Sequence, residues 1–508
     1  MRPTFTTRLA TLGLAVVMCG PAFTASGQNG RALTMVGGEA DERLRLAPLT
    51  DSSAQDGGLL RSPSRFLTRS DHEGLRIGPL GPELRVIDNS ALPFGPNEGG
   101  LWAGRGVNAM VTGGVVADWR SVRLVLAPSL LAEENRSFQV IPYPESTVPA
   151  RSIWANPFHP PPESIDLPVR FGDDAHTRMT PGQSSLTITA GALDFGISTE
   201  NEWWGPGVRN AIVMSNNAEG IPRLFLRPAA PRHTRFGEVD FDLMVGRPHD
   251  SPYFTQEPNG RVLTGGAISW HPTFERALSL GAARLRMDGT AGHAQMSSLF
   301  GRYTFPDAGF QVYVEWARFE DPKSLRDLLE FPQHSQGYTY GLQWAHPEVL
   351  HGMFRLQLET TYLEPDASLR VRPVLTSYTS NTVLEGFTER GQVIGAGIGP
   401  GSSSQWFSAD VFRPLVRFGI FAERIRYDNG VVYEPIVPEV KRPDITVLAG
   451  LRASRSWRGI TALVQLSNAV RLNYLNQSYL DDASNGRTSG VDIENRTLAM
   501  TLSTALPR

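Results

Sequence analysis

Apolar and polar side chains alternate along most of the chain from about residue 101 onward. A period of two is typical of β-strands whose two faces meet different surroundings. In residues 237–246, for example, the polar face carries Glu238, Asp240 and Asp242. The same pattern recurs in five further segments, which are 310–316, 354–362, 416–423, 462–466 and 497–506. The sequence therefore predicts an all-β chain, with charged side chains on one face that pair with arginines of neighbouring strands.

Two fold classes produce this alternation: a soluble β-sandwich or propeller, and a transmembrane barrel whose apolar face meets lipid. An export signal, strands that continue to the last residues, and Trp or Tyr near many strand ends favour the barrel. No segment after the N-terminal one holds 18 consecutive apolar residues, so helical membrane spans are not expected. The chain length predicts a transmembrane antiparallel β-barrel of roughly 14 to 18 strands, with an even number expected.

The first residues have the composition of a signal peptide. Arg2 and Arg8 precede the apolar run 9–18, and small residues follow, so residues 1–27 are predicted to be removed near Gly27. The single cysteine of the chain is Cys19, and the bulky Met18 before it argues against lipidation. The mature chain is therefore expected to have no disulfide and no thiolate metal ligand, and the outer membrane is the expected location.

The rest of the chain divides into two parts. Residues 28–100 are rich in Pro, Gly and Arg and predict a small N-terminal periplasmic or plug region, with a short helix over 41–49. Residues 101–508 predict the barrel, in which 321–330 has helical spacing and 142–168 forms a Pro-rich loop. The apolar phase shifts around Gly191, which predicts a β-bulge there.

Composition and local motifs exclude several function classes. Acidic and basic residues are interspersed and the net charge is only −3, so nucleic acid is not an expected partner. His346 and His351 lack a third partner at metal-ligand spacing, and neither a Gly-x-Ser-x-Gly elbow nor a phosphate loop is present. No metal and no cofactor are expected. An outer-membrane enzyme, such as a lipase using scattered Ser and His, stays open as a third function class.

The segment 198–217 has the most distinctive composition of the chain, STENEWWGPGVRNAIVMSNN. The run Gly205, Pro206 and Gly207 predicts a tight, rigid turn beside two tryptophans. A rigid indole face suits the C–H face of a sugar, and carboxylates and amides suit its hydroxyl groups. The candidate carbohydrate-binding residues are Glu200, Glu202, Trp203, Trp204, Asn216 and Asn217. The alternatives are packing or interfacial tryptophans, and Glu200 with Glu202 as an acid/base pair that no other motif supports.

This segment resembles the motif of the capsule assembly Wzi family, in which Trp-Trp-Gly-Pro-Gly is followed by Ser/Thr-Asn-Asn, here Ser215-Asn216-Asn217, and by Ile221-Pro222. Similar stretches lie at 191–194, 316–329 and 391–405, so the resemblance covers most of residues 100–508. It implies an outer-membrane, lectin-like barrel of about 18 strands that a helical bundle closes at its periplasmic end and that retains capsular polysaccharide. The chain departs from the family in its Pro- and Gly-rich region 28–100 and in its end, Leu506-Pro507-Arg508, which has no terminal aromatic residue.

The function expected from the sequence is therefore non-enzymatic. The chain is expected to bind exported capsular polysaccharide or exopolysaccharide and to help its assembly or attachment at the cell surface. Outer-membrane lipid is the other expected partner, and the sequence leaves the oligomeric state open. The alternative is an outer-membrane porin or oligosaccharide channel, which shares the fold but needs an open lumen.

Overall fold

The computed structural model describes residues 31–50, 58–67, 74–138, 174–251, 260–349, 351–366, 372, 376–380, 382–428, 442–474 and 492–504. The predicted signal peptide and the Pro-rich loop 142–168 lie outside these residues.

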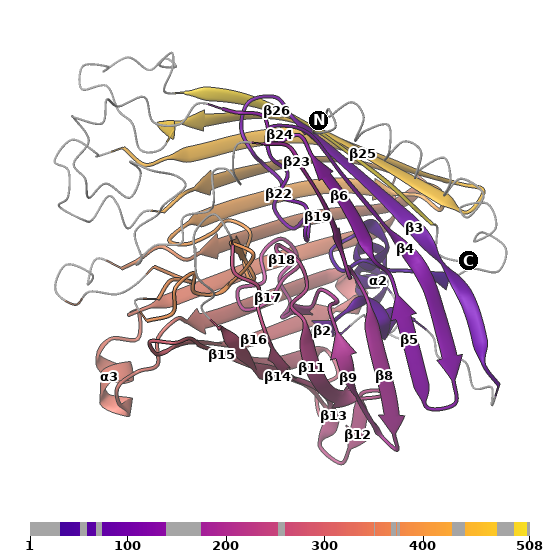
Figure 1. The fold of residues 1–508 in the computed structure, drawn as a ribbon, viewed down its shortest axis with the longest axis vertical. Helices are drawn as coiled ribbons and strands as arrows, with labels where there is room; N and C mark the ends of the chain where they lie inside the picture. Colours follow the sequence, from indigo (N-terminus) through magenta and orange to yellow (C-terminus); the bar gives the residue numbers. More distant parts are fainter. Residues whose placement is uncertain are drawn as a thin grey trace.

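One large antiparallel sheet makes up most of the described chain (Figure 1). Its strands are β3 (Arg76–Asn89), β4 (Gly106–Trp119), β5 (Val122–Leu126), β6 (Ser129–Glu133), β7 (His176–Thr180), β8 (Ser185–Ala190), β9 (Leu193–Ser198), β11 (Arg223–Pro228), β12 (Arg232–Thr234), β13 (Gly237–Gly246), β14 (Val262–Pro272), β15 (Leu278–Asp288), β16 (His293–Phe305), β17 (Phe310–Arg318), β18 (Gln336–Val349), β19 (Gly352–Tyr362), β22 (Ser403–Phe412), β23 (Val416–Arg426), β24 (Ile445–Trp457), β25 (Ile460–Leu472) and β26 (Ile493–Thr504). The short β1 (Arg31–Ala32) joins β3 in parallel.

The sheet closes on itself, because β26 pairs with β3 and β9 pairs with β11. Three strands of the ring are each interrupted and consist of two consecutive segments. Segments β5 and β6 both hydrogen-bond to β4 and form one strand, and β7 and β8 form the next strand, because they bond to β6 and β5. Segments β11 and β12 likewise form one strand beside β13. Counted in this way, and with β1 left aside, the 22 sheet segments form an 18-stranded barrel. The prediction of an even-numbered antiparallel barrel is confirmed, at the upper end of the predicted range. Closure satisfies the backbone hydrogen bonds that an open sheet edge would leave unpaired.

The wall has an apolar outer face and a polar inner face. Across β23 to β26, register pairing places one leucine or isoleucine of each strand in a row. Their exposed fractions are 49% for Ile420, 62% for Leu451, 53% for Leu466 and 44% for Leu498. On the inner face, polar and charged residues are buried, among them Asp242, Arg355 and Asp410. An apolar outer face and a polar interior are the pattern of a barrel surrounded by lipid. Among the described helices, none is long and apolar enough to cross a membrane.

The two ends of the barrel differ in their connections. Hairpins such as those at 412–416 and 457–460 are short, whereas connections such as 198–223 and 362–403 are long. In outer-membrane barrels the short turns face the periplasm and the longer loops face outward, which orients the chain. The helix α3 (Leu325–Glu330) projects among the long connections (Figure 1). It confirms the helix expected over 321–330 but starts later, because the Ser324 side chain caps it by accepting the Asp327 N–H.

Two predictions from the sequence were wrong. The barrel starts at Arg76 and not at residue 101, because β3 pairs with both β26 and β4 and is needed to close the ring. Gly191 does not form a bulge. It occupies the two-residue turn between β8 and β9, where Ala190 pairs with Leu193 and the φ angle of Gly191 is 61°. The apolar phase shifts there because the chain reverses direction.

The remaining short elements lie inside or at the ends of the ring. They are α2 (Glu39–Thr50), β2 (Leu60–Arg61), η1 (Pro63–Phe66), β10 (Trp203–Trp204), η2 (Pro306–Ala308), β20 (Thr388–Glu389) and β21 (Gln392–Val393). The helix expected over 41–49 is confirmed as α2, and Figure 1 shows it within the ring of strands. Of the helical bundle that the resemblance implies, the described part of residues 31–100 contains α2 and the 3-10 turn η1.

An arginine on the outer face should distinguish a lipid-facing wall from a water-facing one. We expect Leu451→Arg to destabilise the folded barrel by about 2–4 kcal/mol in lipid bilayers, because a charge there must enter hydrocarbon. Leu329→Arg on α3, where the leucine is 73% exposed, is the matched control and should change little. Urea unfolding in bilayers, followed by gel mobility without boiling, measures both. Equal stability of the two variants would contradict a membrane-embedded wall.

Candidate functional site

The lumen of the barrel is occupied by four segments of the chain, which we call the plug. They are the N-terminal residues 33–67 and parts of three long connections, 90–104, 199–222 and 376–402, in so far as the structure describes them. Apolar side chains from the plug and from the inner wall form one continuous core, which includes Trp204, Ile212 and Ile394 of the plug and Met287 and Phe300 of the wall. The candidate residues of the sequence analysis all lie in this plug.

The two tryptophans are buried at the centre of the plug. Trp203 and Trp204 form β10, which pairs with β2, and each is only 1% exposed. The Trp203 indole N–H donates to the Gly207 carbonyl at 3.0 Å, and the Arg61 guanidinium lies over its ring at 5.3 Å. Trp204 packs in the main core. Neither indole presents a free face to the outside of the barrel.

The Gly-Pro-Gly run forms a tight bend in which neither glycine can carry a side chain without strain. Gly205 has a φ of 102°, which side chains disfavour, and a Cβ on Gly207 would lie 2.3 Å from the Asn210 carbonyl oxygen. The α2 side chain Arg45 donates to the carbonyls of Pro206 at 2.6 Å and Gly207 at 3.1 Å. The bend therefore holds the tryptophans and also receives the N-terminal helix.

The two glutamates have separate, structural partners. Glu200 accepts hydrogen bonds from Ser64 at 2.8 Å and Ser198 at 3.2 Å. Glu202 forms an ion pair with Arg223 at 2.6 Å. Burial raises the pKa of Glu202, and the neighbouring arginine opposes that shift. With side chains 1% and 2% exposed, the two carboxylates lie among protein groups and not along an open cleft.

The two asparagines join plug segments that are distant in sequence. The Asn216 amide donates to the Val36 carbonyl at 2.7 Å, and the Asn217 amide donates to the Val393 carbonyl at 2.9 Å. The Ser215 N–H donates to the Ile394 carbonyl at 2.9 Å. The stretches 198–217 and 391–405, which the sequence analysis noted separately, are therefore packed against each other. The structure brings all six candidate residues together, and sugar contact by them stays a prediction.

Charged residues of the wall hold the N-terminal part of the plug. Arg65 of η1 pairs with Asp240 at 2.6 Å and Asp242 at 3.1 Å. The expectation that Asp240 and Asp242 line the lumen and pair with arginine is correct, but the arginine comes from the plug and not from a neighbouring strand. For Glu238 the expectation is wrong, because this residue is 35% exposed and lies 3.4 Å from the exposed His233 near the β12–β13 turn. Glu359 likewise accepts backbone N–H groups of the plug, including that of Asn210 at 2.7 Å.

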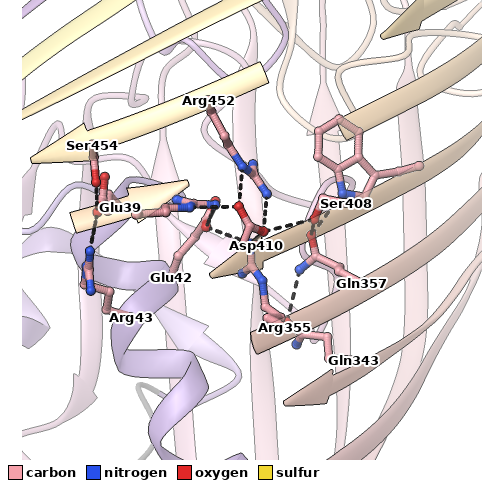
Figure 2. Close-up of polar contacts among 12 residues, drawn as sticks. Glu39, Glu42, Arg43, Gln343, Arg355, Gln357, Ser408, Asp410, Arg452 and Ser454 are labelled. Carbon is pink, nitrogen blue, oxygen red and sulfur yellow. Dashed lines mark hydrogen bonds and ion pairs between the residues drawn. The ribbon is translucent and has the colours of Figure 1, made fainter. Parts of the chain in front are cut away.

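A larger charge cluster docks α2 (Figure 2). Asp410 of β22 receives three arginines of the wall, Arg355 at 2.6 Å, Arg417 at 3.0 Å and Arg452 at 2.6 Å. Glu42 of α2 adds a second carboxylate, at 2.7 Å from Arg417 and 3.2 Å from Arg355. Three cations therefore face two anions, and the second anion is supplied by the helix.

A second contact fixes the same helix, because Glu39 of α2 accepts from the Ser454 hydroxyl at 2.5 Å and from Arg43 at 2.8 Å (Figure 2). The sequence analysis missed this cluster. Alternation over 354–362 placed Arg355 on the polar face of a strand, but it did not show which strands and which helix meet. Beside the cluster, a cavity of about 150 Å³ remains between α2 and the inner face of β25 and β26. Within the described ranges, no three His, Cys, Asp or Glu side chains gather closely enough to hold a metal ion.

The closed antiparallel ring, apolar outside and filled inside, defines the class of the chain as an outer-membrane β-barrel. Residues 93–308 match the family model of capsule assembly protein Wzi. This match confirms, over part of the chain, the resemblance drawn from the motifs. A closed barrel with an apolar, lipid-facing wall lies in the outer membrane. No curated protein sequence matches the chain.

A solved structure has a similar fold, and two further ones match with lower TM-scores. Wzi of Escherichia coli, an outer-membrane protein involved in group 1 capsule assembly and a carbohydrate-binding β-barrel, is similar with a TM-score of 0.57 and 10% identity, covering 84% of this chain and 85% of that one. OccAB2 of Acinetobacter baumannii has a TM-score of 0.41 and 10% identity, covering 83% and 97%. OccK2 of Pseudomonas aeruginosa, solved with glucuronate, has a TM-score of 0.42 and 8% identity, covering 85% and 98%.

Removing the central anion should disrupt the docking cluster. We expect Asp410→Asn to destabilise the barrel by about 3–5 kcal/mol, because three buried arginines lose their shared partner. Asp288→Asn removes an exposed pair with Arg286 and should have no measurable effect. The temperature at which the folded form disappears from unboiled gels reports the difference. Wild-type stability of Asp410→Asn would show that the cluster does not hold the plug.

The docking of α2 should also depend on pH. Burial raises the pKa of Glu42, but Arg417, Arg355 and Arg452 lower it more, to about 2 from an ordinary 4.5. Because the folded protein favours the ionised carboxylate, Glu42 stabilises the docked helix above pH 4.5. This stabilisation is lost as the pH falls toward 2 and the carboxylate becomes protonated. The side chain is 29% exposed, so solvent screening reduces the effect. We expect the rate at which pepsin cuts α2, divided by its rate on an unfolded reference peptide in the same sample, to rise as the pH falls through this window, and Glu42→Gln to remove that rise. An unchanged pH profile in Glu42→Gln would assign it to other groups.

Proposed function

We propose that this chain binds exported capsular polysaccharide or exopolysaccharide and helps to assemble or attach it at the cell surface. The observation that carries the proposal is the filled lumen of a Wzi-related barrel. Four chain segments occupy the interior and are held there by buried ion pairs and an apolar core. A barrel filled in this way is suited to hold a polymer at its outer face and not to pass it through the wall.

No covalent chemistry is required by this proposal. The carboxylates most suited to acid/base catalysis, Glu200 and Glu202, are already engaged by Ser64, Ser198 and Arg223. Support for a carbohydrate ligand comes from the family match and from Escherichia coli Wzi, which is a carbohydrate-binding β-barrel.

Deletion of the gene tests the proposal directly. In a strain that exports polysaccharide, we expect the cell-attached fraction to fall and the released fraction to rise, with the total unchanged. The wild-type gene supplied in trans should restore attachment. Unaltered attachment in the deletion strain, with the protein shown to be produced in the parent, would refute the proposed function.

The tryptophan motif can serve this function through structure or through contact with the sugar. Because both indoles are buried, we expect Trp203→Ala with Trp204→Ala to destabilise the plug first, by several kcal/mol in total from lost packing. Trp457→Ala, at a residue 62% exposed near a short turn, is the control. Gel mobility and retained polysaccharide are measured together. Normal folding with lost retention would support sugar contact at the motif, and lost folding would support the packing role.

A porin would conduct ions through an open lumen, whereas a filled barrel would not. We expect no large, stable openings in planar bilayers, because the plug fills the lumen and wall charges such as Arg355 and Glu359 are bound to the wall or to the plug. Stable conductance steps of the purified protein would favour a channel over a surface-binding barrel.

A further inference from the structure

Four nitrogen-bearing side chains lie together at the long-loop end of the barrel, and we call them the basic arc: His176, Arg178, His249 and Arg390. His176 and Arg178 stand on β7, directly after a long connection. His249 follows the end of β13, and Arg390 follows β20 in the plug. Their side chains are 27–46% exposed, so all four are accessible to solvent at this end of the barrel.

The partners of the arc lie beneath it and are acidic. Glu389 is fully buried and pairs with His249 at 2.7 Å, and Glu133, 1% exposed, pairs with His176 at 2.7 Å. Glu219, 11% exposed, connects Arg178 at 2.6 Å with Arg390 at 3.4 Å. The carboxylates therefore hold the bases from below. The surface that meets the outside consists of guanidinium and imidazole groups, which donate hydrogen bonds.

Arg390 is the member of the arc with the most free donor capacity. Its Nε faces Glu219 at 3.4 Å and Glu389 at 3.7 Å, while its two terminal nitrogens have no partner among the described residues. Its φ is 51°, a left-handed conformation that costs energy in a residue other than glycine. The Arg390 N–H bonded to the His249 carbonyl at 2.9 Å holds it there. This conformation belongs to the two-residue turn between β20 and β21, in which Gly391 also has a positive φ of 81°.

We propose that the basic arc binds the carboxylate groups of an acidic polysaccharide, with the Arg390 guanidinium as its main contact. A planar guanidinium matches the two oxygens of a uronate carboxylate, and the neighbouring imidazoles reach hydroxyl groups of the same or the next sugar. The inference rests on the proposed function and adds to it the chemical class of the polymer and the place where it binds.

Binding of two defined polymers to the purified full chain in detergent tests the inference. Polygalacturonate is the acidic probe, and dextran is its uncharged counterpart. We expect the wild type to bind polygalacturonate at least tenfold more tightly than dextran, with an affinity that falls as salt rises.

Arg390→Gln should weaken polygalacturonate binding about tenfold. Arg390→Lys, which keeps the charge but not the planar fork, should fall between the two. Arg326→Gln, at an arginine on α3 that is 85% exposed, is the matched control.

Each result gives a decision, provided gel mobility shows that the variants fold. Selective binding of polygalacturonate, lost in Arg390→Gln and kept in Arg326→Gln, supports the arc. Equal binding of both polymers, or full binding by Arg390→Gln, overturns the arc and leaves the proposed function in place. If neither polymer binds, the arc is overturned, and the attachment assay in the deletion strain then decides the proposed function separately.

Discussion

Charge buried inside the barrel is the constraint on which the rest of this structure depends. A closed wall in lipid presents its apolar residues outward, so its charged residues collect in the lumen, where each needs a partner. Asp410 pairs with three arginines of the wall, whose combined positive charge one carboxylate does not neutralise. Glu42 of α2 supplies a second negative charge. Asp240 and Asp242 receive Arg65 in the same way. Without the plug, the wall would therefore hold buried charges that lack part of their partners, and the same holds for the plug without the wall.

This mutual dependence determines what the barrel can do. The N-terminal segment enters the lumen beside the short turns, where α2 lies against η2, and three long connections enter from the opposite end. The Gly-Pro-Gly bend joins the two groups, because Arg45 of α2 binds its carbonyls. Because plug segments fill the lumen from both ends, a large ligand has to be recognised at the outward surface of the barrel.

The sequence predicted the fold better than the site, for a physical reason. Period two reports only the contrast between the faces of each strand. Together with the export signal and the aromatic residues near strand ends, this contrast was sufficient to predict the closed barrel and its polar lumen, while the helix α2 was predicted from its own local sequence. It did not separate the turn at Gly191 from a bulge, since both shift the apolar phase, and it did not assign Arg76–Asn89 to the wall because Pro and Gly are frequent there. The composition of 198–217 marked it as a candidate sugar-binding segment, and that role stays a prediction. Its burial, and the pairing of Asn217 with Val393, depend on contacts between distant segments that no local pattern encodes.

The central claim is that the chain holds polysaccharide at its outer face while the plug stays in place. Glu39 and Ser454 touch across the boundary between α2 and β24, and the mature chain is expected to contain no cysteine, so cysteines at these two positions can be joined by a short, cleavable thiol cross-linker. The decisive measurement is the fraction of polysaccharide that stays attached to cells before cross-linking, after it, and after cleavage. The account predicts the same attached fraction in all three states. A fraction that falls on cross-linking and recovers on cleavage would show that the plug must move, and would contradict the account.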